Sequence, residues 1–392
     1  MKYFALMIVI CCIAVSCATP QPVPVSEEIL VSEDEQMLWR RAQQEQEKIN
    51  NSGLIYQDAG LENYLNKIAA RLQAYTTTPG MSFQIKVVKD PNLNAFAFPN
   101  GVIYVHTGVL ARMDNEAQLA ALLAHEMIHC TQRHSLMLLR SIKDRPAYLA
   151  AAQHALAKIA MIRDVAQFLG VTGSIAAVTG YTREFETEAD LMGLDLMEKA
   201  NYDYREALKL FEHLKQEIKN EGIEEPFFFG THPNVQQRID NLTNWLATKY
   251  QGNHTGVKNT EIFQAVLRPV VLDNAKLDLR LGRFYAAQRT VEKYMRMAPD
   301  DAKGYYLFGE ILRQRGLQGD SKKAIEYFEA AISLDPLFSA PHKAMGLIHY
   351  RRGENRLAQK FFESCLLLSP DAPDKAYIRE YLQKCTDSGE KS

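Results

Sequence analysis

A spacing of about 34 residues recurs in the C-terminal third of the chain and constrains the fold more than any other feature. Pro336 and Pro370 are 34 residues apart, and the same offset relates Ala324 to Ala358. Pro299 lies 37 residues before Pro336, and a turn between two helices can absorb the three extra residues. A unit of this length cannot bury its own apolar face, so we expect neighbouring helix pairs to stack into a solenoid.

This period, together with small residues in both helices and a proline at the end of each unit, resembles the tetratricopeptide repeat. Residues 261–370 hold about three units, and residues 372–385 are predicted to form a capping helix. We therefore predict an all-α tetratricopeptide-repeat solenoid over residues 261–385. An unrelated helical bundle is the alternative, which three aligned units disfavour. Such a solenoid offers a concave surface to peptides or proteins and has no chemistry of its own.

The N-terminus has the pattern of a bacterial lipoprotein signal. Lys2 precedes an apolar run, residues 3–15, that is too short to span a membrane comfortably. Residues 1–16 are therefore predicted to be a signal peptide, and cleavage before Cys17 would leave that cysteine lipidated. An ordinary signal peptide or an N-terminal anchor is the alternative.

Residues 17–32 are predicted to be a tether, because three prolines within a short polar run favour an extended chain. Ala18 differs from the aspartate that retains lipoproteins of enteric bacteria in the inner membrane. By that analogy we expect the protein in the periplasm, attached to the outer membrane through the lipid on Cys17.

Charge and cysteine usage exclude some classes of protein. The formal net charge of −2 gives no basic face for phosphates, so we expect no nucleic acid partner. Without the signal and Cys17, only Cys130, Cys365 and Cys385 remain, which are too scattered for a disulfide framework. An oxidising periplasm permits a disulfide between Cys365 and Cys385, and the sequence leaves this open.

Residues 33–250 read as a separate, mixed domain that ends at a polar break over 249–260. It opens with helical patterns and then changes to an alternating pattern rich in β-branched and aromatic residues. We expect two or three strands between residues 82 and 106, followed by one helix over residues 115–140. The predicted fold class is therefore α+β, mostly helical, with a small β-sheet.

The predicted helix over residues 115–140 carries His125, Glu126 and His129. Histidines four residues apart project from one face of a helix, so both rings can reach one metal ion. Glu126 would lie beside that ion, where a carboxylate can accept a proton from a bound water. This short pattern also arises by chance, so a third ligand is needed to support a metal site.

The third ligand is predicted on a second helix. The metzincin solution fails, because Gln132 and Ser135 stand where glycine and histidine are required, and His134 is expected off the ligand face, as a flank or a helper. Glu186 and Asp190 again share one helical face. Glu186 can complete a three-residue site of the kind that catalytic zinc uses, and Asp190 can accept the spare N–H of a ligand histidine.

These elements together resemble the gluzincin peptidases of the HtpX, Oma and CAAX-prenyl-endopeptidase family. The resemblance also includes residues 94–110, similar to the edge strand of that family, and residues 231–239, "THPNVQQRI". It covers residues 33–245 and implies a minigluzincin-like metalloprotease domain that binds one zinc ion per chain. A tethered enzyme with C-terminal repeats resembles the periplasmic branch of β-barrel assembly-enhancing proteases.

The resemblance implies a role for each site residue. Zinc would be held by His125, His129 and Glu186, with Glu126 as the general base. For the group that stabilises the oxyanion we name His232 first and Tyr181 or Arg183 as alternatives. His232 could instead take the open zinc position and hold the enzyme latent, or simply be a loop histidine. An extended substrate is expected to pair with the strand at Phe96, Ala97 and Phe98.

Three functions remain in competition. The first is a zinc endopeptidase acting on periplasmic or outer-membrane proteins in their quality control or assembly, with the repeats contacting the assembly machinery. The second is a repeat-based chaperone or adaptor with latent or occasional proteolysis. The third, a pseudoenzyme, is disfavoured because the metal ligands and the base are all present.

Overall fold

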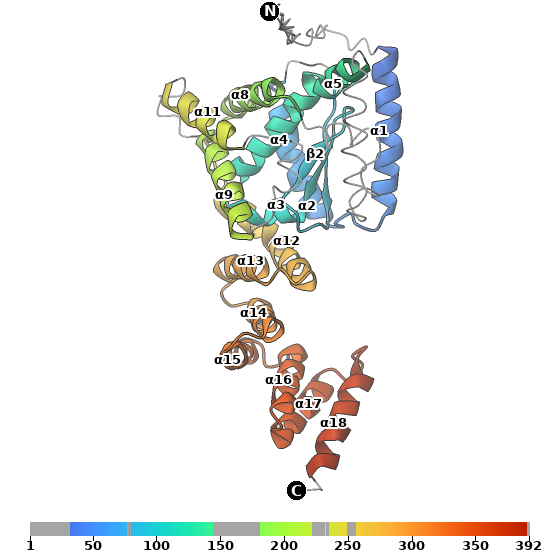
Figure 1. Cartoon of the computed structure of the whole chain (residues 1–392), viewed down its shortest axis with the longest axis vertical. Helices are drawn as coiled ribbons and strands as arrows, with labels where there is room; N and C mark the ends of the chain where they lie inside the picture. Colours follow the sequence, from blue (N-terminus) through green and yellow to red (C-terminus); the bar gives the residue numbers. More distant parts are fainter. Residues whose placement is uncertain are drawn as a thin grey trace, which may run out of the picture.

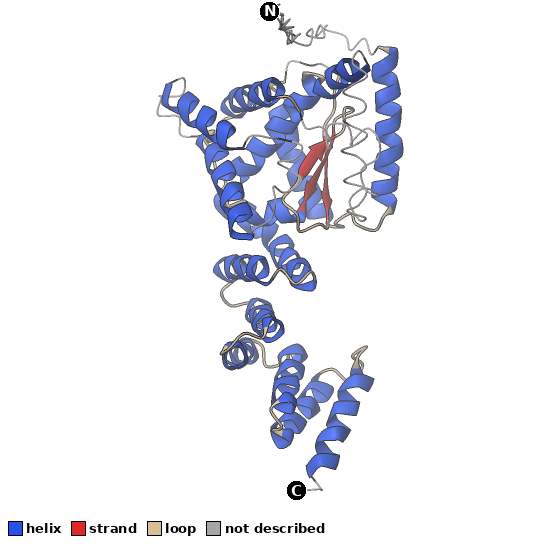
Figure 2. Ribbon diagram, viewed as in Figure 1, coloured by secondary structure: helices blue, strands red, loops and turns tan. Residues whose placement is uncertain are grey.

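The computed structural model describes residues 32–76, 78, 80–143, 181–221, 232, 235–248 and 256–389. The predicted signal peptide, the lipidation site Cys17 and nearly all of the tether lie outside these residues, as does the segment 149–180. The described chain is mostly helical with one small sheet, followed by helical repeats, which confirms the predicted fold class (Figure 2). Within those residues, none of the helices combines the length and apolarity that a membrane crossing requires.

Among its described residues, the N-terminal part contains three strands and eight helices. The strands are β1 (Gln84–Val88), β2 (Ala95–Ala97) and β3 (Val102–His106), which confirms the predicted position of the sheet. The helices are α1 (Glu33–Asn51), α2 (Ala59–Gln73), α3 (Thr107–Arg112), α4 (Glu116–Thr131), α5 (His134–Lys143), α8 (Arg183–Lys199), α9 (Arg205–Glu221) and α11 (Val235–Thr248).

The sheet has the order β1-β3-β2, with β3 parallel to β1 and antiparallel to β2. Alternation along the strands sends Phe96, Phe98 and Tyr104 into a cluster with α1. Ala95 and Ala97 point to the opposite face, toward the core that contains α2 and α4. Figure 1 accordingly shows the sheet between α1 and α4. The small alanines let α4 pack close to β2.

The two edges of the sheet differ. On β1, the backbone N–H of Tyr56 donates to the carbonyl of Val87 at 2.8 Å, and the Asn66 side chain bonds both the N–H and the carbonyl of Ile85. These contacts cover the outer edge of β1. Strand β2 pairs with β3 alone, and among the described residues no backbone pairing covers its outer edge.

The prediction of one helix over residues 115–140 is wrong, because the chain breaks between α4 and α5. Arg133 adopts a left-handed conformation with φ of 55°, which is uncommon for a residue other than glycine. Its Nε lies 3.0 Å from Oε1 of Glu35, a buried carboxylate of α1, and this ion pair stabilises the turn. The break redirects the start of α5 so that His134 faces back toward α4.

The C-terminal part consists of three helix pairs and a last helix, as predicted. The pairs are α12 (Thr260–Arg280) with α13 (Phe284–Met297), α14 (Ala302–Arg315) with α15 (Asp320–Leu334), and α16 (Ser339–Arg351) with α17 (Asn355–Leu368), followed by α18 (Lys375–Gly389). In the second pair a Cβ on Gly309 would lie 2.5 Å from the ring of Phe328, and in the third a Cβ on Gly346 would lie 2.6 Å from that of Phe362. The second and third pairs therefore each pack an aromatic ring of one helix against a glycine of the other. Cys365 and Cys385 are both buried and free.

Helix α12 joins the two parts of the chain. Phe263, Leu267 and Val270 on its first half belong to the core of the N-terminal part. Residues on its second half, such as Val271 and Ala275, belong to the core of the repeats. Figure 1 shows the repeats continuing from this helix as a column below the sheet.

Arg112, at the end of α3, ties the same junction with polar contacts. Its guanidinium contacts Glu217 of α9 at 3.1 Å, Thr290 of α13 at 2.7 Å and Asp278 of α12 at 3.3 Å. Because the Arg112 side chain is only 8% exposed, these contacts are largely shielded from solvent. The repeats are therefore attached by a packed core and a buried ion-pair network.

The glycine-to-ring closure predicts a destabilising Gly346→Ala substitution, although alanine has the higher helix propensity. The added methyl would meet the Phe362 ring, and we expect the free energy of unfolding to fall by about 1–3 kcal/mol, measured by urea unfolding. Adding Phe362→Val should recover part of the loss, because the first helix pair has buried Ala275 and Val291 at the corresponding positions. If the two substitutions changed the free energy of unfolding in a strictly additive way, the proposed contact between residue 346 and the Phe362 ring would be contradicted.

Candidate metal centre

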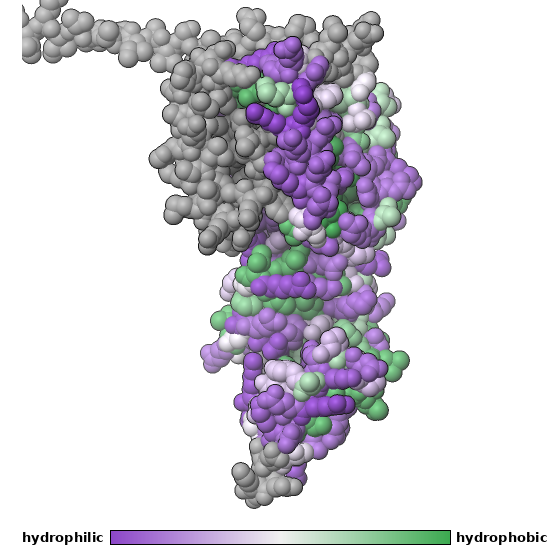
Figure 3. Space-filling model, turned by 90° about the vertical axis from the view of Figure 1, so that its right-hand side faces the viewer, coloured by the Kyte–Doolittle hydropathy of each residue, from purple (hydrophilic) through white to green (hydrophobic). Residues whose placement is uncertain are grey.

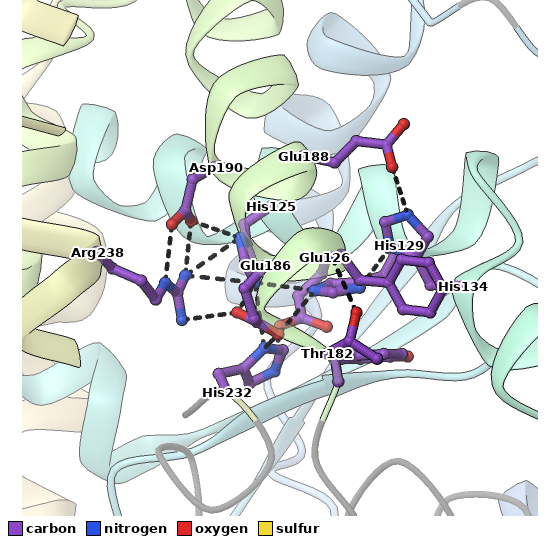
Figure 4. Close-up of polar contacts among 12 residues, drawn as sticks. His125, Glu126, His129, His134, Thr182, Glu186, Glu188, Asp190, His232 and Arg238 are labelled. Carbon is purple, nitrogen blue, oxygen red and sulfur yellow. Dashed lines mark hydrogen bonds and ion pairs between the residues drawn. The ribbon is translucent and has the colours of Figure 1, made fainter. Parts of the chain in front are cut away.

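The site lies where α8 packs against α4. Gly193 of α8 faces the backbone of Ala124 and His125, so the two helices approach closely. The side chain of Asn115 accepts a hydrogen bond at the start of α4, and that of Thr182 does so at the start of α8, which defines where each helix begins. This packing presents side chains of both helices to one buried point, as Figure 4 shows.

Four side chains converge on that point. His125 and His129 come from α4, Glu186 from α8 and His232 from the segment before α11, and one candidate ligand atom of each lies within 4.8 Å of the others. Nε2 of His129 is 3.0 Å from Nε2 of His125 and 3.5 Å from Oε1 of Glu186. Nδ1 of His232 is 3.1 Å from Nε2 of His125. All four side chains are buried.

Glu126 lies beside this group and outside it. Its Oε1 is 3.4 Å from Nε2 of His232, and its side chain is buried. Among the described residues, Oε1 of Glu126 and Oε2 of Glu186 have no hydrogen bond of good geometry. Buried carboxylate oxygens normally have a partner, so Oε1 of Glu126 is compatible with a ligand at the site, whereas Oε2 of Glu186 also lies 2.9 Å from NH1 of Arg238.

Asp190 and Arg238 support the group from one side. Oδ1 of Asp190 is 2.9 Å from Nδ1 of His125. Arg238 of α11 contacts Asp190 at 2.6 Å and 2.8 Å through two nitrogens, and its NH1 is 2.9 Å from Oε2 of Glu186. Arg238 is almost fully buried, and its guanidinium lies over the ring of Phe211. Arg238 thus contacts the carboxylates of both Glu186 and Asp190.

The pKa values reflect this charge pattern. Burial raises the pKa of Glu186, but His232 and Arg238 outweigh burial and hold that pKa below its ordinary value. Burial, followed by the neighbouring imidazoles, lowers the pKa of His129 well below its ordinary value, so its ring is neutral. Burial lowers the pKa of His232, but the carboxylates of Glu186 and Glu126 overcome it and raise that pKa to about 9.

The other residues singled out in the sequence lie at different distances from the group. The ring of Tyr181 stacks on that of His129 at 3.8 Å, and its hydroxyl lies 2.9 Å from that of Ser135. Arg183 is exposed at the start of α8. His134 is fully buried, with its Nδ1 2.9 Å from Nδ1 of His129.

The donor set fits a zinc ion. Tetrahedral zinc with bonds of about 2.0–2.1 Å places its ligand atoms roughly 3.3 Å apart. Five of the separations among the imidazole nitrogens and the Glu186 oxygens are 2.9–3.5 Å, and all four ligand atoms lie within 4.8 Å of one another. Two or three imidazoles and one carboxylate are also the ligand types that zinc takes in catalytic sites.

Comparison with known proteins identifies the domain. Residues 57–246 match peptidase family M48, and residues 302–336 match a tetratricopeptide repeat. By this match the N-terminal part is similar to a peptidase family M48 domain, and it is called the M48 domain. The match places the candidate metal centre within a metallopeptidase family, so a metal cofactor is implied. The resemblance to gluzincin peptidases with C-terminal repeats is confirmed.

Two curated relatives match different shares of this chain. The "Beta-barrel assembly-enhancing protease" of Escherichia coli K12 is 26% identical over 309 residues, which cover 75% of this chain and 58% of its own. The "Mitochondrial metalloendopeptidase OMA1" of Schizosaccharomyces pombe is 31% identical over 183 residues, 47% of this chain and 52% of its own. The chain thus spans a little over half the length of these relatives.

Two polar residues of the M48 domain site were not assigned by sequence reasoning. Arg238 belongs to the segment "THPNVQQRI", which the sequence singled out without giving the arginine a role. The place of Arg238 in that segment was the available signal. Glu188, whose Oε2 is 3.3 Å from Nε2 of His134, gave no signal, because the break at Arg133 that brings His134 there is not visible in the sequence.

The bridge formed by Arg238 predicts a large loss of stability in Arg238→Met. This change leaves Glu186 and Asp190 buried without their cation, and we expect the free energy of unfolding of the metal-free protein to fall by about 3–5 kcal/mol, measured in urea at neutral pH. Arg238 and His125 hold the pKa of Asp190 below its ordinary value despite burial. That contribution is present at neutral pH and lost only in strong acid. Asp190→Asn in the Arg238→Met background should recover part of the loss, and no recovery would contradict the pairing.

Proposed function

We propose that this chain is a zinc-dependent endopeptidase that hydrolyses peptide bonds of periplasmic or outer-membrane proteins. The observation that carries the proposal is the convergence of four ligand-type atoms within 4.8 Å, with the Glu126 carboxylate beside them, in a peptidase M48 domain. One zinc ion per chain would be held by His125, His129 and Glu186. Bound zinc supplies a Lewis acid that activates water and polarises the scissile carbonyl.

The remaining steps fall to the side chains of the chain. Glu126 accepts the proton of the attacking water and passes it to the leaving amine, which suits a carboxylate held beside the ligands without a hydrogen bond to its Oε1. Asp190 accepts the N–H at Nδ1 of His125 and so directs Nε2 of that ring to the ligand point. The surrounding burial excludes bulk water from these groups.

His232 is proposed as the fourth ligand of a latent state. Its Nδ1 is 2.9 Å from Oε1 of Glu186 and belongs to the ligand cluster, while its Nε2 is near Glu126. The ring therefore fills the space between the base and the ligand point, where the water would have to bind. Displacement of His232 would open that position, and the displaced imidazole remains available as an oxyanion donor. Tyr181 is less suitable because its hydroxyl contacts that of Ser135. Arg183 is less suitable because its side chain is exposed.

The substrate is proposed to bind in extended form along β2, at Phe96, Ala97 and Phe98. The outer edge of β1 is covered, whereas among the described residues β2 has a backbone partner on one side only, and it packs against the α4 helix that carries the base. Strand addition uses main-chain hydrogen bonds and therefore accepts many sequences. Cys130, next to His129, donates its thiol to the carbonyl of Phe98 at 3.4 Å and links the edge strand to the metal-binding helix.

The location and clients of the enzyme follow from the parts outside the M48 domain. We propose a signal peptide at 1–16, lipidation of Cys17, a tether at 17–32, the peptidase domain at 33–250 and the repeats at 261–385. This organisation would hold the enzyme at the periplasmic face of the outer membrane and let the repeats contact protein clients or an assembly machine. The name of the Escherichia coli relative supports a role in the quality control or assembly of outer-membrane proteins.

A repeat-based chaperone or adaptor with occasional proteolysis is the second candidate. Large apolar side chains are exposed along the repeats, including Tyr285, Leu317, Leu337 and Leu367. Figure 3 shows hydrophobic patches there, separated by hydrophilic side chains. The intact base and ligand set favour the endopeptidase over this alternative.

The assignment of the base predicts that Glu126→Gln lowers kcat for peptide hydrolysis by roughly 10²–10⁴-fold, because the amide cannot accept the proton of the water. Zinc content, measured by atomic absorption, should stay at one ion per chain. Wild-type kcat in this variant would refute Glu126 as base, and full complementation of a deletion strain by it would favour the adaptor.

The latent state predicts opposite changes in two quantities for His232→Ala. Loss of the fourth ligand should weaken zinc binding, measured by competition with a chromogenic chelator, while opening the water position should raise hydrolysis of an unstructured peptide at saturating zinc. If His232 served only as an oxyanion donor, kcat would instead fall by roughly 10²–10³-fold with zinc affinity unchanged.

A further inference from the structure

The two histidines proposed as zinc ligands have different partners at their second ring nitrogen. Nδ1 of His125 meets the carboxylate of Asp190 directly, at 2.9 Å. Nδ1 of His129 meets a third histidine, because Nδ1 of His134 lies 2.9 Å away. Figure 4 shows the His134 ring between His129 and Glu188, on the side of the site away from Arg238.

The His134 ring is held firmly in this position. Its side chain has no exposed surface, and its ring stacks on that of Phe185 with centroids 4.4 Å apart and planes 11° apart. Its Nε2 lies 3.3 Å from Oε2 of Glu188, the residue two positions after the ligand Glu186 on α8. Both ring nitrogens of a fully buried histidine are thus used in polar contacts.

The protons of this chain of contacts can be assigned from the site. A ring that binds a metal through Nε2 carries its proton on Nδ1, so His129 must donate from Nδ1. Nδ1 of His134 must then accept, which places the His134 proton on Nε2. That N–H points at Glu188, whose carboxylate can accept it.

We propose that His134 and Glu188 form a positioning relay for His129, which fixes its ring orientation and increases its basicity as a zinc ligand. The inference rests on the proposed metal centre and adds the residues that hold its second histidine. In this arrangement Nδ1 of each ligand histidine is connected to a carboxylate of α8. Nδ1 of His125 contacts Asp190 directly, and Nδ1 of His129 is connected to Glu188 through His134. Asp190 is buried and paired with Arg238, whereas the Glu188 side chain is 43% exposed and paired with neither that arginine nor the metal ligands.

The break between α4 and α5 places His134 where it can contact His129. A continuous helix would carry residue 134 away from the face of His129, five positions earlier. The left-handed Arg133 instead turns α5 so that the two Nδ1 atoms face each other. An uncommon backbone conformation next to a functional group is consistent with a constraint on that group.

The test measures zinc affinity and the tautomer of His134 in the full chain. His134→Phe preserves a planar ring against Phe185 and removes the acceptor for His129, and we expect zinc affinity to fall roughly 10–100-fold. His134→Gln offers an amide oxygen at that place and should recover part of the loss. Zinc dissociation constants come from competition with a chromogenic chelator, and circular dichroism checks that each variant is folded.

Glu188→Gln tests the far end of the relay, with Glu184→Gln as its matched control. Both change the same charge on an exposed side chain of α8, one turn apart, but only Glu188 contacts His134. We expect zinc affinity about threefold to tenfold weaker for Glu188→Gln and unchanged for Glu184→Gln, because an amide oxygen is a weaker acceptor than a carboxylate. Equal affinities of these two variants would overturn the role of Glu188.

Two further results separate the relay from a purely structural role. The absorption spectrum of the cobalt-substituted protein should shift in Glu188→Gln and stay as in the wild type in Glu184→Gln. Long-range ¹H–¹⁵N correlation spectra of the zinc-loaded protein should show His134 protonated at Nε2, and protonation at Nδ1 would overturn the assignment. If the wild type binds no zinc through His125, the proposed function itself fails, independently of the His134 and Glu188 variants.

Discussion

Glu186 and Asp190 are buried one turn apart on the same face of α8, and the guanidinium of Arg238 contacts both and, together with His232 at Glu186, favours their charged forms. Without a partner, two desolvated carboxylates at this separation would raise each other's pKa. Arg238 also attaches α11 to α8, so one ion-pair group fixes the helix packing and the charge of the site together. The orientation of His125 follows from Asp190, and the charge available at the ligand point follows from Glu186.

Three of the four ligand-type side chains come from two helices, α4 and α8, that are far apart in the sequence. The neutral His129 ring and the charged Glu186 are the protonation states that zinc binding requires, since ligands must offer a free electron pair. Of the four ligand-type residues, His232 is the one that lies outside the described helices. A ligand on a connecting segment can leave without disturbing the α4–α8 packing, which is what a reversible latent state needs.

Sequence reasoning reached the parts of the site that depend on helical periodicity. The four-residue spacings of His125 with His129 and of Glu186 with Asp190 place each pair on one face, and the structure brings both pairs together. Helical periodicity does not predict contacts that depend on a local break in a helix. Arg133 has no sequence mark of a left-handed residue, so the predicted helix continued past it and the position of His134 was lost. The contact of Arg238 with α8 depends on tertiary packing that a single sequence does not specify.

Helix α12 contributes its first half to the core of the M48 domain and its second half to the core of the repeats. Rotation of the repeats about this helix would therefore expose apolar surface on one side or the other, and Arg112 would lose its buried partners. A protein client bound to the repeats, as proposed, would therefore lie at a fixed distance and in a fixed direction from the edge strand β2. In the proposed endopeptidase, the choice of the bond to be cut would then come from the distance between the bound client segment and the metal centre, with little demand on the residues that flank the bond.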